Sequence, residues 1–322
     1  MNLRRLRQNS HILDLTSSVT LTPKKFIQPL FVVEGLREKK QVAGLPSVFQ
    51  ETPESLLKQV EKDLETGISK FILFGVPGQK TEQRNFDVSF ATQQITALKK
   101  TFGSDIWLAT DVCLCSYTHH GHCGILNEDG DHLENGFSVQ ALAEVALAYA
   151  QAGADCVAPS DMMDSRVHAI RSLLQENGFD RTVLMSYSSK FSSSFYGPFR
   201  EAADSTPRAQ GLKDRSSYQV SPSNYADALR SCLRDRDEGA DILMVKPGLP
   251  YLDVLYRLSQ EIPDLPWAAY EVSGEYAGIE ALAEKGLMNA QRAHLEAWTG
   301  FFRAGASMLI SYGARFAGEW IR

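Results

Sequence analysis

A regular alternation of short apolar segments with helical patterns limits the fold of this chain more than any other feature. Eight segments are rich in β-branched or aromatic residues and are apolar at successive positions, as parallel strands buried on both faces are. We expect these strands at Phe26–Val33, Phe71–Val76, Ile106–Val112, Asp155–Ala158, Thr182–Tyr187, Asp241–Val245, Pro266–Val272 and Ser307–Tyr312. Helical patterns lie between them, at Glu54–Glu65, Val139–Gln151, Val167–Glu176, Asn224–Glu238, Leu252–Ser259 and Ala290–Arg303.

Four of the expected strands are preceded by the same kind of joint, in which a glycine follows a helical pattern. The glycines are Gly67, Gly153, Gly239 and Gly305. A glycine just past a helix end can adopt the left-handed conformation that closes the helix, so the joint predicts a repeated turn from helix to strand. Eight alternating strands favour a closed (β/α)8 TIM barrel. An open doubly wound sheet stays an alternative, because the period alone does not show closure.

Length and composition agree with one large domain. A chain of 322 residues suits a single barrel with additions, and 43% hydrophobic with 22% charged residues describes a globular protein. A net charge of −6 gives no general attraction to nucleic acid or to an anionic membrane. The sequence has no apolar run long enough to span a bilayer and no secretion signal, so we expect a cytoplasmic protein.

Two segments interrupt the alternation. Residues 1–25 are polar and basic and predict an N-terminal arm ahead of a catalytic barrel at 26–322. The connection from about residue 190 to residue 224 contains serines, aromatic residues and several arginines. A connection of this length inside a compact domain is usually functional or disordered, and we interpret it as a lid over the active site.

The strongest local motif follows the third expected strand. Three of the five cysteines, Cys113, Cys115 and Cys123, lie there beside three histidines. Three thiolates predict a zinc site with an open fourth position for water or substrate. The alternative is that these are incidental cysteines at a strand end.

Two lysines follow expected strands. Lys246 ends the sixth strand, and Lys190 follows the fifth. Burial disfavours an ammonium group, and two ammonium groups at one barrel mouth disfavour each other, so one amine can be neutral and nucleophilic. A single lysine at this place could instead be a structural ion-pair partner.

Anion-binding candidates lie in the expected lid and at the last two strand ends. Arg200 and Arg215 could each grip a carboxylate with two hydrogen bonds, although lid arginines are often only solvated. Ser273 and Tyr312 could donate hydroxyl hydrogen bonds to a second carboxylate. Ser273 and Tyr312 fall at the carboxyl ends of strands, as do Asp111, the three cysteines and the two lysines, and these ends form the catalytic face of a barrel.

Taken together, these motifs resemble the porphobilinogen synthase family, also called the 5-aminolevulinate dehydratases, over about residues 1–318. The matching motifs are DVCLC and HGHCG (111–124), VAPSDMMD (157–164), SYSSKF and FYGPFREAA (186–203), DRSSYQ (214–219), LMVKPGLPYLD (243–253) and VSGEYA (272–277). The resemblance implies a lyase of heme biosynthesis that condenses two molecules of 5-aminolevulinate to porphobilinogen, with loss of two waters.

The resemblance also implies a role for each site residue. Lys246 matches the Schiff-base lysine and Lys190 its partner, while the three cysteines match the ligands of the active-site zinc. Side chains matching those that hold the substrates are Arg200, Arg215 and Gln219 for the second molecule, Ser273 and Tyr312 for the first carboxylate, and Asp111 for the amino group. In this family the N-terminal arm embraces a neighbour within a homo-octamer.

The chain departs from the family pattern at several positions. Ser116 and His119 replace proline and serine, Ser165 replaces a glycine, and the segment 82–91 retains only Ser89 of a glycine-serine pair. Ser217 stands where some animal members have a cysteine that serves a second zinc, which favours one zinc per active site. Ser231 stands where many bacterial members have a glutamate contacting an allosteric magnesium, which argues against activation by magnesium.

Two other functions are compatible with part of these motifs. A Schiff-base aldolase would also need a strand-end lysine, but it has no use for three thiolates. A zinc-stabilised oligomeric scaffold without activity would not need both lysines and both lid arginines. The combined set of residues favours the dehydratase over either alternative.

Overall fold

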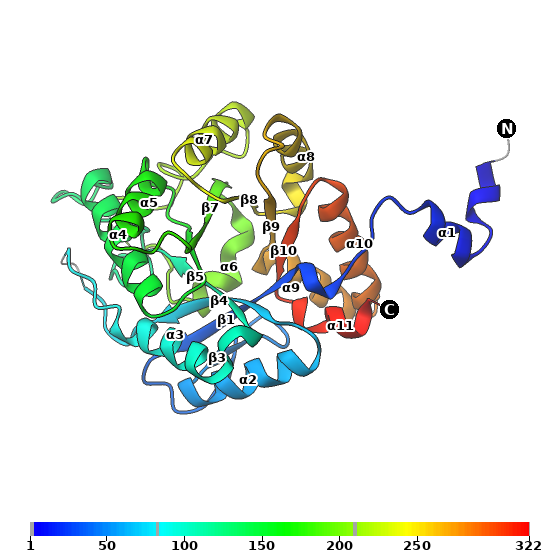
Figure 1. The fold of residues 1–322 in the computed structure, drawn as a ribbon, viewed down its shortest axis with the longest axis horizontal. Coiled ribbons are helices and arrows are strands. Elements are labelled where there is room, and N and C mark those ends of the chain that lie inside the picture. Colours follow the sequence, from blue (N-terminus) through cyan, green and yellow to red (C-terminus); the bar gives the residue numbers. More distant parts are fainter. Residues whose placement is uncertain (1–2, 82–83, 209–210, 322) are drawn as a thin grey trace.

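The strands close into a ring. The structure is a computed structural model that describes residues 3–81, 84–208 and 211–321. Parallel neighbours follow one another in the order β1 (Phe26–Val33), β4 (Lys70–Val76), β5 (Trp107–Val112), β6 (Cys156–Pro159), β7 (Val183–Lys190), β8 (Ile242–Lys246), β9 (Trp267–Glu271) and β10 (Met308–Ser311). Strand β10 then pairs with β1, with Phe26 opposite Leu309. The pairing confirms the (β/α)8 barrel and excludes the open sheet (Figure 1).

Helices surround the strands. The larger ones are α2 (Pro53–Glu65), α3 (Ser89–Phe102), α4 (Asn135–Gln151), α5 (Arg166–Glu176), α7 (Tyr225–Asp237), α8 (Leu252–Glu261), α9 (Ser273–Glu284) and α10 (Ala290–Arg303). Shorter ones are α1 (Ser10–Thr16), α6 (Gly197–Ala202) and α11 (Ala317–Trp320), with 3-10 turns η1 (Leu3–Arg7), η2 (Pro23–Lys25), η3 (Gly103–Asp105), η4 (Ser194–Tyr196), η5 (Leu249–Tyr251) and η6 (Ala314–Phe316). The six predicted helices are present, with ends that differ by a few residues.

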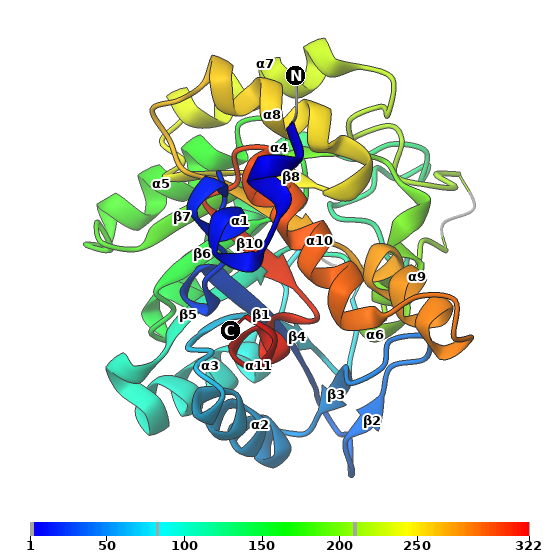
Figure 2. The same ribbon diagram turned by 90° about the vertical axis from the view of Figure 1, so that its right-hand side faces the viewer.

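Two short strands were not predicted. Strand β3 (Phe49–Glu51) extends the sheet beside β1, and β2 (Lys40–Gln41) pairs with it in the antiparallel direction. Both lie together at the lower edge of the view in Figure 2. Their two and three residues are too few to show a period in the sequence.

The four predicted glycine joints have left-handed backbone conformations. The φ angles of Gly67, Gly153, Gly239 and Gly305 are 85°, 103°, 100° and 105°. Each glycine follows a helix end directly and leads into the next barrel strand. At Gly305 a side chain would also lack space, because a Cβ atom would lie 2.3 Å from the Oγ of Ser259.

Alternating side chains of the strands separate two apolar cores. One core, which includes Ile27, Phe31, Ile72 and Met244, fills the interior of the barrel. The other, which includes Leu30, Leu73 and Leu243, lies between the strands and the helices. The barrel interior is thus packed with side chains, and polar groups gather at its carboxyl end.

The start of the chain lies apart from the barrel. Elements η1 and α1 contain no buried residue, and four leucines on them are exposed: Leu3, Leu6, Leu13 and Leu15. Figure 1 shows this segment extending away from the ring of helices.

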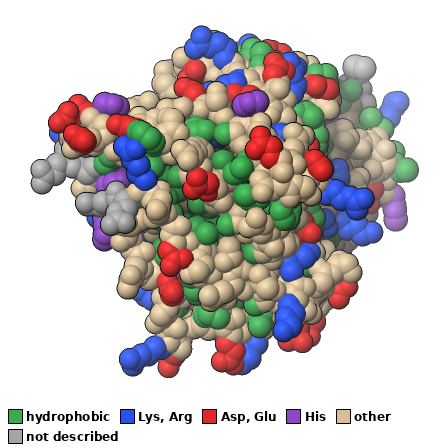
Figure 3. All heavy atoms as spheres, turned by 60° about the vertical axis from the view of Figure 1, so that its left-hand side comes forward, with side chains coloured by type: hydrophobic (Ala, Val, Ile, Leu, Met, Phe, Trp, Pro, Cys, Tyr) green, Lys and Arg blue, Asp and Glu red, His purple; other side chains and the backbone are tan. Residues whose placement is uncertain are grey.

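The surface carries both kinds of charge. On the face shown in Figure 3, basic and acidic side chains are intermixed. Within the described ranges, no helix is both long and apolar enough to cross a membrane.

Candidate active site

The two predicted lysines lie side by side at the carboxyl ends of adjacent strands. Lys190 on β7 is paired in register with Lys246 on β8. A shift in register between Ser186 and Ser189 extends β7 as far as Lys190, three residues beyond the end predicted from the sequence. Both side chains are buried, and the Lys190 ammonium donates a hydrogen bond to the backbone carbonyl of Ser160.

An aromatic cage surrounds the Lys246 amine. Its Nζ lies 4.0 Å from the ring centre of Tyr270, 4.9 Å from those of Tyr187 and Phe199, and 5.6 Å from that of Tyr196. Burial, followed by the charge of Lys190, lowers the pKa of Lys246 to about 7. The sequence interpretation did not include this cage, because its rings come from two strands and from the segment between Phe191 and Val220.

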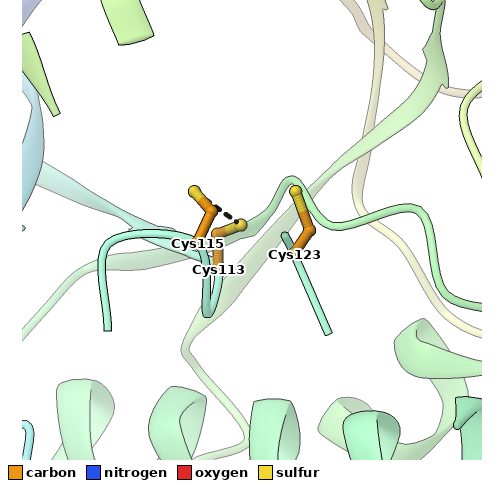
Figure 4. Close-up of side chains that lie close together, drawn as sticks. All are labelled: Cys113, Cys115 and Cys123. Carbon is orange, nitrogen blue, oxygen red and sulfur yellow. Dashed lines mark hydrogen bonds between the residues drawn. The ribbon is translucent and has the colours of Figure 1, made fainter. Parts of the chain in front are cut away.

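The three predicted cysteines converge. All are buried, and their sulfur atoms lie within 4.8 Å of one another. Cys113 and Cys115 follow β5 and are 3.2 Å apart at their sulfur atoms, while Cys123 approaches them from the end of the same loop (Figure 4). Hydrogen bonds from Cys113 and Cys115 hold the pKa of the Cys123 thiol well below its ordinary range, and the charge of Arg215 acts in the same direction.

Asp111 lies near both the two lysines and the cysteine loop. It lies on β5 two residues before Cys113 and is partly exposed. Burial raises the pKa of its carboxyl group, against the charges of Lys190 and Lys246 and a hydrogen bond with Ser160. These effects show that the carboxyl group lies within electrostatic reach of both amines.

The segment from Phe191 to Val220 begins and ends beside the lysines. The amide of Phe191 donates to the carbonyl of Lys246, and the amide of Val220 donates to the carbonyl of Lys190. The Tyr196 hydroxyl bonds the carbonyls of Phe191, at 2.8 Å, and Lys246, at 3.1 Å. The segment is therefore attached directly to both lysine-bearing strand ends.

Three predicted binding side chains of this segment have unused hydrogen-bonding capacity. Arg215 is buried and donates to the carbonyls of Gly121 (3.0 Å) and Ser205 (2.6 Å), but its Nε has no partner in the part of the chain that the structure describes. The Nε of Arg200 and both amide atoms of buried Gln219 also lack a partner there. Burial and the charge of Arg215 lower the pKa of Arg200, which places the two guanidinium groups near each other.

Ser273 and Tyr312 follow the last two barrel strands, β9 and β10. Ser273 begins α9, where its hydroxyl accepts from the amide of Phe199 (3.0 Å) and donates to the carbonyl of Phe195 (3.3 Å). Tyr312 follows β10, and its hydroxyl accepts from that of Tyr270 at 3.5 Å. The structure therefore brings all the predicted site residues to one mouth of the barrel.

Comparisons with known proteins agree on one family. A sequence profile described as "Delta-aminolevulinic acid dehydratase" matches residues 1–320. The chain belongs to the delta-aminolevulinic acid dehydratase family. It is 43% identical to the enzyme of that name from Methanothermus sociabilis, with 97% of this chain and 96% of the relative covered. The Bacillus subtilis dehydratase is 42% identical, with 99% and 97% covered.

A solved dehydratase has the same architecture. The crystal structure of the Toxoplasma gondii delta-aminolevulinic acid dehydratase, in complex with its reaction product porphobilinogen, superposes with a TM-score of 0.93. It is 40% identical, and the match covers 99% of this chain and 91% of that chain. The expected family, barrel and hydro-lyase class are thereby confirmed.

The departures from the dehydratase pattern have local consequences. Ser165 has a φ of 65°, a left-handed conformation that glycine adopts at less cost. Ser116 donates a hydrogen bond of 2.9 Å to the carbonyl of Ala203 and so links the cysteine loop to the Phe191–Val220 segment. Residues 82 and 83, at the start of the divergent segment, lie outside the described residues.

Proposed function

We propose that this protein is a porphobilinogen synthase that joins two molecules of 5-aminolevulinate, with loss of two waters, through a Schiff base on Lys246. The observation that carries the proposal is the pairing of two buried lysines beside three converging cysteines at the barrel mouth. A Schiff-base aldolase would use the lysines but would leave the thiols without a role. The names of the relatives and the product bound to the Toxoplasma gondii structure support the same reaction.

Lys246 is the better nucleophile of the two lysines. Its pKa of about 7 leaves a large share of the amine neutral at neutral pH. The neutral amine attacks the ketone carbon of the first substrate, and the resulting carbinolamine loses water to give the Schiff base. Lys190, which is paired with Lys246 on the adjacent strand, would donate the proton that the departing hydroxyl needs.

The cysteines suit a zinc ion. Soft thiolates select zinc, whereas magnesium prefers hard oxygen ligands. The close approach of three buried sulfur atoms fits this donor set. Cys113, Cys115 and Cys123 would hold the ion, which as a Lewis acid would polarise the second substrate.

The remaining polar side chains would bind the two substrates. Arg215, Arg200 and Gln219 have free donors for the carboxylate of the second molecule. The hydroxyls of Ser273 and Tyr312 would bind the carboxylate of the first, and Asp111 a substrate amino group. Ser273 now bonds Phe195 and Phe199, so we propose that residues 190–224 act as a lid whose contacts rearrange as substrate enters.

The N-terminal arm, residues 1–25, would contribute to assembly. Its four exposed leucines lie on a segment that leaves the barrel, and burying them against a neighbouring copy would remove them from water. We propose a homo-octamer in the cytoplasm, with the small-molecule substrate as the other partner and neither nucleic acid nor membrane among its ligands.

A colour assay for pyrroles tests the proposed function. Purified protein incubated with 5-aminolevulinate should form porphobilinogen, detected with an aldehyde reagent, and a zinc chelator should stop it. A protein that forms no pyrrole with zinc present would contradict the proposal. Cleavage or formation of an aldol in the same protein would favour the aldolase instead.

A further inference from the structure

A charged cluster lies behind the strand ends that carry Ser273 and Tyr312. His294 on α10 is fully buried between two carboxylates. Its Nδ1 lies 3.1 Å from an oxygen of Glu271 at the end of β9, and its Nε2 lies 2.9 Å from an oxygen of Glu280 on α9. Nothing in the proposed reaction uses these three side chains.

The geometry fits a protonated imidazole. A neutral imidazole has one donor nitrogen and one acceptor nitrogen, whereas both nitrogens of His294 face carboxylate oxygens. The imidazolium donates to both and compensates the charge of Glu271, which is itself fully buried. A buried carboxylate without such a partner is costly, so His294 stabilises the fold around Glu271.

Glu271 connects the last two strands of the barrel. Its second oxygen accepts hydrogen bonds from the Ser311 hydroxyl on β10, at 2.5 Å, and from the Trp298 indole on α10, at 3.0 Å. The Ser311 hydroxyl in turn accepts from the amide of Gly313 at 3.0 Å. The cluster thereby fixes β9 and β10 to each other and to α10 where both strands end.

The same strand ends carry the site on their other face. Successive side chains of a strand point to opposite sides. Glu271 and Ser311 point toward α10, while their neighbours Tyr270 and Tyr312 point into the barrel, where their hydroxyls meet and the Tyr270 ring lies 4.0 Å from the Lys246 amine. Tyr276 adds a direct path, because its ring contacts those of His294 (5.1 Å) and Tyr312 (5.9 Å).

We propose that His294 is a positioning residue for the substrate carboxylate: by compensating Glu271, it holds Ser273 and Tyr312 at the spacing that the carboxylate of the Schiff-base substrate requires. The inference rests on the proposed function. It predicts that loss of the imidazolium weakens carboxylate binding more than it slows the chemistry. In the part of the chain that the structure describes, the hydrogen bonds of the cluster involve neither the three cysteines nor the two lysines.

The test measures two constants in the wild type and in each variant. They are KM for 5-aminolevulinate and the inhibition constant of 4-oxopentanoate, which is the substrate without its amino group. His294→Leu should raise both by about tenfold or more, because the buried Glu271 loses its partner. Glu271→Gln with His294→Leu should return both to within about threefold of wild type, because an amide keeps an acceptor for Ser311 and Trp298 without charge. In both proteins kcat should change by less than about threefold.

A pair of serine variants tests the inference without disturbing the charges. Ser311→Ala removes the bond from β10 to Glu271 and should raise the inhibition constant by about threefold to tenfold. Ser307→Ala is the control, because Ser307 bonds the amide of Trp267 at the other end of the same two strands, at 3.4 Å. Its inhibition constant should equal that of the wild type.

Three results would overturn the inference. One is an unchanged inhibition constant in both His294→Leu and Ser311→Ala. Another is a double variant that binds as poorly as His294→Leu, since His294 would then supply packing rather than charge. A wild-type protein without pyrrole formation would contradict the proposed function and this inference together, whereas active wild type with unaffected variants contradicts this inference alone.

Discussion

At the residue scale, the surroundings of Lys246 determine how much of its amine is neutral at pH 7. An exposed lysine has a pKa near 10.4, so roughly one amine in 2,500 is neutral at pH 7. Burial and the adjacent Lys190 bring the pKa of Lys246 to about 7, where about half of the amines are neutral. In the proposed mechanism, burial and the pairing would thus supply a neutral amine without a separate base.

This pKa predicts the acid side of the pH profile. Because the protonated amine cannot attack, the rate of adduct formation should fall about tenfold per pH unit well below pH 7. Lys190→Ala removes the like charge, raises the pKa of Lys246 and should move the fall to higher pH. The rate of borohydride trapping against pH measures both, and an identical profile in the variant would show that Lys190 does not affect the amine.

Replacing Arg215 with lysine should weaken substrate binding although the charge is kept. Two carbonyls already occupy part of its guanidinium, and a lysine cannot keep those bonds and also grip a carboxylate. Arg215→Lys should raise KM by about 10-fold to 100-fold, the range for a lost hydrogen bond to a charged group. Arg208→Lys, an exposed residue of the same segment paired with Asp204, is the control and should leave the substrate dependence unchanged.

The residues that could be predicted were those with distinctive chemistry. Cysteines and lysines at expected strand ends, together with arginines in the expected lid, indicated a site because they occur in combination. The aromatic cage and the His294 cluster gave no such indication. Tyr187, Tyr270 and Trp298 look like core residues in the sequence. Only the structure shows the Lys246 amine beside the two tyrosine rings and Glu271 bonded to the Trp298 indole.

At the scale of elements, buried strands and strongly amphipathic helices were predictable. Helix α9 was not predicted, because only Ser273, Glu275 and Tyr276 are buried on it and it contains glycines at 274 and 278. Helix α3 was missed although it buries an apolar face of Phe90, Ile95 and Leu98. The divergent sequence before it obscured where it begins.

The glycine joints allow a direct test at this scale. Gly305→Ala should destabilise the protein by about 1–3 kcal/mol, because alanine is strained at a φ of 105° and its Cβ would overlap Ser259. Gly278→Ala, in α9 with no atom within 4 Å of the new Cβ, should be neutral or stabilising by about 0.5–1 kcal/mol. Thermal unfolding measures both, and equal midpoints would show that the joint tolerates a side chain.

At the scale of the whole molecule, the eight strands and their order could be predicted from the sequence, but the closure of the sheet into a barrel could not. The pairing of β10 with β1 joins residues almost three hundred positions apart, which no local period reports. Closure is what brings Tyr312 to the same mouth as Lys190 and Lys246. The active site is therefore a property of the complete barrel.

The proposed zinc site also depends on the assembled loop, because it needs all three cysteines together. Exhaustive chelation should abolish pyrrole formation, and zinc should restore it while magnesium should not, because the three sulfur ligands are soft. Metal analysis of the chelated protein is the control. Full activity in protein shown to contain no metal, or recovery with magnesium alone, would remove zinc from the account.

The most direct test of the account is borohydride reduction in the presence of 5-aminolevulinate, followed by peptide mapping. The trapped substrate should be found on Lys246, and Lys246→Ala should lose this adduct together with almost all turnover. Lys190→Ala should lose turnover yet still be trapped slowly on Lys246. Label on Lys190 alone in the wild-type protein would reverse the two roles, and an active wild-type enzyme with label on neither lysine would contradict the Schiff-base mechanism.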